Sequence, residues 1–83
     1  MTMLRLDPAH PPLWRDHRTL QFGRDAVARI DDPAGWQQRL VHELEGGIPA
    51  SAAEVLAVAA GGTARGARAL LAQLAPALKR PAP

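Results

Sequence analysis

The sequence contains no cysteine and only a small net charge. The lack of cysteine excludes disulfide bonds and thiolate metal sites, although it leaves the redox compartment open. No uninterrupted apolar stretch approaches the ~20 residues that a membrane-spanning helix needs, so we expect no membrane partner. The opening segment MTMLRLDP is followed at once by prolines and charged residues, so it is not a secretory signal. These absences predict a cytoplasmic protein.

The charge and size of the chain set further limits. Ten basic residues against eight acidic ones give a formal net charge of +2. A charge this small permits contact with an acidic peptide or with phosphate, but it indicates neither by itself. A chain of 83 residues makes one domain with a small core, to which eleven leucines contribute.

The stretch from residue 51 to residue 78 has the pattern of two helices joined by a glycine turn. Ser51 and Glu54 have the spacing of a capping box, which predicts a helix start. Gly61-Gly62 predicts the end of that helix, and Thr63 is the expected cap of the next one. The second helix carries an apolar stripe at helical spacing, made of Ala67, Leu70, Leu71, Leu74 and Leu78.

The first half of the chain predicts a small antiparallel meander of short strands. Thr19-Leu20-Gln21-Phe22 alternates polar and apolar residues, so that Leu20 and Phe22 share one face. Gly23 and Asp25 supply turn chemistry before the next apolar run. The expected strands are Leu13–Arg15, Thr19–Phe22 and Ala26–Ile30.

A helix is expected after the meander. Asp31-Asp32-Pro33 combines acidic capping residues with a proline, which is favoured at the first helical position. The predicted fold is therefore α+β, with a three-strand meander followed by three helices in a winged-helix or helix-turn-helix-like arrangement. We expect an N-terminal arm over 1–12, the domain over 13–78, and a disordered tail or linker start over 79–83.

The segment LWRDHRTLQFG, the third strand, the DDP helix start and two alanine- and leucine-rich helices together resemble a known region. They are similar to the N-terminal part of actinobacterial ThiF-type adenylyltransferases and of cyclodehydratase-like proteins of peptide natural-product pathways. That part looks like the winged-helix peptide-recognition element typified by PqqD, known as a RiPP recognition element. The resemblance covers residues 4–78.

The resemblance implies that the domain binds a leader peptide as an added strand, in a groove between the third strand and the last helix. The partner would be a peptide or protein, such as an acidic leader peptide or a biosynthetic enzyme. The groove residues that the resemblance implies are Ala26, Ala28 and Ile30 on the strand, and Arg65, Arg68, Ala69 and Ala72 on the helix.

No catalytic constellation is predicted. His10, His17 and His42 lack the short spacing of metal ligands. Asp31-Asp32 is interpreted as a helix cap, and Ser51 has no neighbouring base. We therefore expect a non-enzymatic module with no cofactor and no metal.

Two alternatives to peptide binding stay open. The first is a DNA-binding helix-turn-helix protein, in which the helix after Thr63 enters the major groove and presents Arg65, Arg68 and Gln73. The second is a dimerisation or assembly domain, because so small a core makes a homodimer reasonable.

Overall fold

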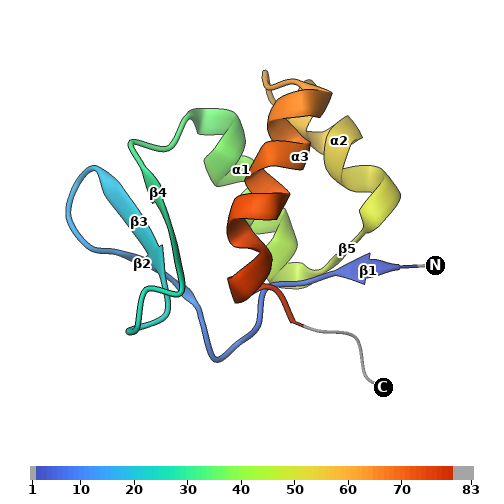
Figure 1. Ribbon diagram of the computed structural model, residues 1–83. Helices are drawn as coiled ribbons and strands as arrows, with labels where there is room; N and C mark the ends of the chain where they lie inside the picture. Colours follow the sequence, from blue (N-terminus) through green and yellow to red (C-terminus); the bar gives the residue numbers. More distant parts are fainter. Residues whose placement is uncertain (1, 80–83) are drawn as a thin grey trace.

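The computed structural model describes residues 2–79 and has an α+β fold. A three-strand antiparallel meander comes first and three helices follow, which confirms the predicted fold class (Figure 1). The meander lies on one side of the molecule and the helices gather on the other. The core fills the space between these two layers.

The meander consists of β2 (Pro12–Trp14), β3 (Thr19–Phe22) and β4 (Ala28–Asp31), in that spatial order. Leu20 and Phe22 of β3 are buried, as their alternation predicts. In β4, Ala28 and Ile30 are buried while the two residues beside them are exposed. One face of the sheet therefore covers the core and the other faces solvent.

The helical layer consists of α1 (Gly35–Gly46), α2 (Ala50–Ala59) and α3 (Ala64–Leu74), with a 3-10 turn η1 (Ala75–Ala77) at its end. The fully buried leucines are supplied by α1 and α3, whereas α2 buries only alanines, at positions 53 and 57. Small side chains let α2 pack closely between the other two helices. The stripe predicted for the last helix is buried at Ala67, Leu70 and Leu74.

The first residues belong to the folded unit. Strand β1 (Met3–Leu4) pairs with β5 (Ile48–Pro49), the short strand that precedes α2. Leu6 is 4% exposed and forms an isolated bridge with Leu78. The amide of Leu6 also donates to the carbonyl of Leu44 in α1. The segment expected as an N-terminal arm is therefore part of the folded unit, and its Leu6 belongs to the core.

Two of the predicted helix starts are wrong and one is confirmed. Asp31 ends β4, and α1 begins only at Gly35, where Gln37 Oε1 accepts from the Ala34 amide. Helix α2 begins at Ala50 without a side-chain cap, because the pairing of β5 with β1 brings the carbonyl of Thr2 to the Ala50 amide. Thr63 caps α3 as predicted, accepting from the Gly66 amide at 2.9 Å.

The end of the chain departs from the predicted continuous helix. Helix α3 stops at Leu74, and Leu78 lies beyond η1 in extended backbone, where it packs against the core. The Lys79 amide donates to the carbonyl of Arg5. The rest of the tail predicted over 79–83 lies outside the described residues.

Trp36 packs against the turn between α2 and α3. A Cβ atom on Gly62 would lie 2.5 Å from Cδ2 of Trp36, and one on Gly66 would lie 3.2 Å from its Cζ2. The first distance is far inside van der Waals contact, so the indole fits there only because residue 62 has no side chain. This contact joins the start of α1 to the turn that orients α3.

We predict that Gly62→Ala destabilises the fold by about 1–3 kcal/mol, because the new methyl overlaps the indole ring. Urea unfolding followed by tryptophan fluorescence measures the loss. Gly46→Ala is the matched control, since nothing lies within 4 Å of its Cβ position at the end of α1. Equal stability of the two variants would contradict the packing described for Trp36.

Candidate functional site

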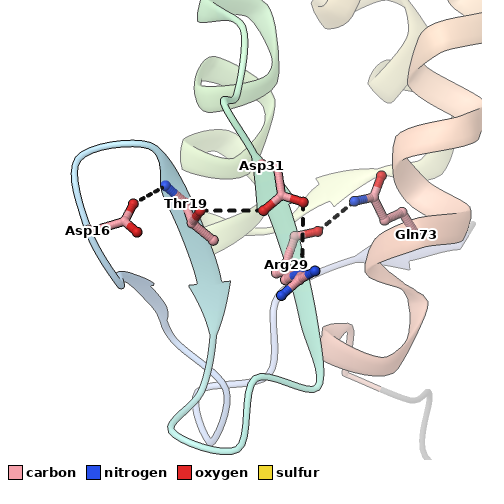
Figure 2. Close-up of polar contacts among 5 residues, drawn as sticks. All are labelled: Asp16, Thr19, Arg29, Asp31 and Gln73. Carbon is pink, nitrogen blue, oxygen red and sulfur yellow. Dashed lines mark hydrogen bonds and ion pairs between the residues drawn. The ribbon is translucent and has the colours of Figure 1, made fainter.

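The meander has two outer edges, and they differ in what they offer to another strand. The edge of β2 contains Pro12, which has no backbone N–H. The edge of β4 contains no proline and faces α3 (Figure 2). Proline therefore removes a pairing group from the β2 edge but from no position of the β4 edge.

Two hydrogen bonds show which residues of β4 face outward. The Asp32 amide donates to the carbonyl of Arg18, so residue 32 faces inward, toward the β3 side. The Gln73 side chain of α3 donates from Nε2 to the carbonyl of Arg29, so residue 29 faces the open side. Because the pairing direction alternates along an antiparallel strand, the N–H and C=O groups of Arg29 and Asp31 share the outer edge.

The side chains of Arg29 and Asp31 lie together on the solvent face of β4 (Figure 2). Arg29 Nε is 3.8 Å from Asp31 Oδ2, and the two side chains are 58% and 67% exposed. Thr19 Oγ1 of the neighbouring strand lies 3.4 Å from Asp31 Oδ1. The outer edge of β4 thus carries one positive and one negative side chain, two residues apart.

The side chains of the strand residues predicted to line the groove, which are Ala26, Ala28 and Ile30, do not line it. Ala28 is 9% exposed and Ile30 is 3% exposed, because both point into the core. Ala26 lies before β4 in a turn, with a φ of 48°. The groove prediction is therefore corrected on the strand side: β4 offers backbone groups and the side chains of Arg29 and Asp31.

On the helix side, Arg65, Ala69 and Ala72 are exposed. Arg65 and Ala69 lie eight and four residues before Gln73, which puts all three in one row along α3. Gln73, in the last turn of α3, is the member of this row that contacts β4. Arg68 points elsewhere, to Glu54 of α2, with Nη1 and Oε1 2.5 Å apart.

The residues predicted for DNA reading are thus partly engaged within the protein. Arg68 is paired with Glu54, and Gln73 is bonded to the backbone of β4. Arg65 is exposed and has no ion-pair partner among residues 2–79. The structure brings Gln73 to the β4 edge and takes Arg68 away from it toward Glu54, while Arg65, Ala69 and Ala72 are exposed on α3.

The turn between β2 and β3 is ordered by Asp16. Its Oδ1 accepts from the amides of Arg18 and Thr19 at 2.8 and 2.9 Å. The hydrogen bond from the Arg18 amide, followed by smaller contributions that include the Thr19 amide, lowers the pKa of the Asp16 carboxyl below its ordinary value. This turn holds Thr19 in place beside Asp31.

Other candidate features give no organised site. Trp14 is 52% exposed on β2. Within residues 2–79, no group of three His, Asp or Glu side chains is close enough together to hold a metal ion. No helix in that range is both long and apolar enough to cross a membrane.

Sequence reasoning missed Arg29 and Asp31 as site residues. The signal was present, because a strand that buries Ala28 and Ile30 must expose the residues between and after them. The bond from Gln73 to the Arg29 carbonyl had no such signal, since it spans 44 residues of sequence.

Comparisons with family models, curated proteins and solved structures returned no match to this chain.

We predict that Asp16→Ala loosens the β2–β3 turn, so that the Thr19 amide exchanges faster with solvent.

In the unaltered protein the pKa of the Asp16 carboxyl is lower than in the unfolded chain. The ionised carboxyl therefore stabilises this turn at pH values above the unfolded pKa, and the stabilisation is lost as the pH falls through the folded pKa. An NMR titration of the Arg18 and Thr19 amide shifts measures the midpoint. A midpoint at or above the ordinary value of 3.8 would contradict the two hydrogen bonds.

Proposed function

We propose that this domain is a non-enzymatic recognition module that binds an extended peptide, or an extended segment of a protein, as an added strand. The peptide pairs with the outer edge of β4 and lies between that strand and α3. The observation that carries the proposal is the outward direction of the Arg29 and Asp31 backbone groups. Main-chain hydrogen bonds supply affinity in this mode, and neighbouring side chains supply specificity.

The surroundings of the edge support strand addition. The Arg29 carbonyl already accepts from the Gln73 side chain, and a carbonyl oxygen has two lone pairs, so a guest amide would share this acceptor or displace Gln73. Ala69 and Ala72 of the same helix are small and exposed. On the other edge of the meander, Pro12 removes one pairing group.

The resemblance to peptide-recognition elements of natural-product pathways points to the same edge, since their groove lies between the third strand and the last helix. We extend the proposal accordingly to a leader peptide or a biosynthetic enzyme as the partner, and to the cytoplasm as the location.

The DNA alternative has weaker support from the contacts. Base reading requires several free donor and acceptor side chains on the recognition helix. Two of the three candidates, Arg68 and Gln73, are bonded to Glu54 and to β4. The homodimer alternative uses the β4 edge itself, which a second copy would cover in place of a peptide.

We predict that Arg29→Pro abolishes peptide binding, because proline removes the outward N–H and its ring occupies the edge. Arg29→Ala is the matched control, since it removes the same side chain but keeps the N–H. Far-UV circular dichroism shows that both variants fold, and chemical-shift changes on titration with an alternating valine and threonine peptide measure binding.

Equal binding by the proline and alanine variants would contradict strand addition at β4. Ala28→Pro is a second control, for which we expect a loss of folding stability. Residue 28 pairs with Phe22 of β3, so proline there disrupts the meander. A concentration-dependent mass in sedimentation experiments that Arg29→Pro removes would assign the edge to a second copy instead.

A titration with random duplex DNA, at low salt and again at moderate salt, separates DNA binding from peptide binding. If the domain binds peptides, we expect only weak association with DNA. Added salt should remove this association to the same extent in the unaltered protein and in the Arg65→Ala/Arg68→Ala variant. Tight binding that both salt and this double substitution abolish would favour the helix-turn-helix alternative, because several phosphate contacts make affinity steeply salt-dependent.

A further inference from the structure

The outer edge of β4 carries a charge pattern as well as backbone groups. Arg29 and Asp31 flank the buried Ile30, and their side chains stand on the solvent face of the strand. On the inner side of β4, the neighbours of these residues in β3 are Gln21 and Thr19, which are uncharged. In the β3–β4 pair, therefore, neither Arg29 nor Asp31 lies opposite a residue of the opposite charge.

An added strand would supply residues directly opposite these two positions. The meander pairs its strands antiparallel throughout, and antiparallel pairing is slightly more stable per residue than parallel pairing. In an antiparallel guest, the residue opposite Asp31 precedes the residue opposite Arg29 by two positions. Directly opposed side chains lie on the same face, so both guest residues would stand beside the exposed Arg29 and Asp31 side chains.

We infer that this edge selects a peptide with the pattern basic residue, apolar residue, acidic residue, read from the amino to the carboxyl end. The inference rests on the proposed strand addition. The basic residue pairs with Asp31 and the acidic residue pairs with Arg29. Each charge then has opposite charges both along and across the strands.

The middle residue of the pattern follows from the same register. It lies opposite Ile30, whose side chain is 3% exposed and points into the core. A guest side chain at that position points to the same face as Ile30, which is the apolar face of the sheet that covers the core. An apolar side chain is therefore favoured there over a charged one.

The test compares two peptides of identical composition, Thr-Val-Lys-Val-Glu-Val-Thr and Thr-Val-Glu-Val-Lys-Val-Thr, titrated into the protein and followed by the amide shifts of β4. We expect the peptide with lysine first to bind about tenfold more tightly at low salt, because it forms favourable pairs where the other opposes like charges. Raising the salt to about 0.5 M should shrink the difference, since the side chains are exposed.

The double variant Arg29→Glu/Asp31→Lys supplies the decisive control. It keeps the backbone edge and the composition of the strand while it reverses both charges, and it should prefer the peptide with glutamate first by a similar factor. The side chains are more than half exposed, so the reversal leaves the core packing unchanged. Circular dichroism and the amide spectrum of the helices verify the fold.

The outcomes separate the inference from the function on which it rests. Equal binding of both peptides to the unaltered protein would overturn the charge pattern and leave strand addition standing. A preference for the peptide with glutamate first would overturn the antiparallel register. Binding of neither peptide to the unaltered protein or to the double variant would overturn strand addition at β4, and the charge pattern with it.

Discussion

The burial of alternate residues in β3 and β4 is the constraint on which the rest of this structure depends. Leu20 and Phe22 from one strand and Ala28 and Ile30 from the next form a single apolar face. Because side chains alternate along a strand, burying this face fixes the register, and a slip of one residue would expose the whole set. The same burial turns the outer edge of β4 toward α3 and places Arg29 and Asp31 in solvent.

Two contacts of the helical layer fix α3 relative to that edge. Trp36 packs against the glycine turn between α2 and α3, so the direction of α3 depends on a position without a side chain. Further along α3, Gln73 reaches across to the carbonyl of Arg29. The Trp36 contact sets the helix in place, and the Gln73 contact, drawn in Figure 2, links it to the strand. The position of α3 beside β4 is therefore set by the fold.

Much of the local structure could be predicted from the sequence. The alternation in Thr19–Phe22, the cap at Thr63 and the stripe from Ala67 to Leu74 each follow from short-range chemistry, and the structure has all three. The third strand begins two residues later than predicted, because Ala26 takes a positive φ in the turn. Alanine gives no side-chain signal for that conformation, which glycine usually fills.

Other errors arose where distant segments override a local signal. Ser51 and Glu54 have capping-box spacing, yet the pairing of β5 with β1 starts α2 two residues earlier, with Pro49 at the N-cap position. Glu54 instead pairs with Arg68 of α3. The candidate site depends even more on such contacts. Neither the bond from Gln73 to Arg29 nor the pairing of Arg68 with Glu54 has a signature in the residues around it, because each joins segments that only the fold brings together.

Amide hydrogen exchange along β4 tests the central claim most directly, and it requires no partner. The account predicts an alternating pattern in the free protein. The amides of Ala28 and Ile30, which face β3, should exchange slowly, and those of Arg29 and Asp31 on the open edge should exchange fast. Equally slow exchange at all four positions would mean that the edge is already paired, and it would contradict the proposed binding site.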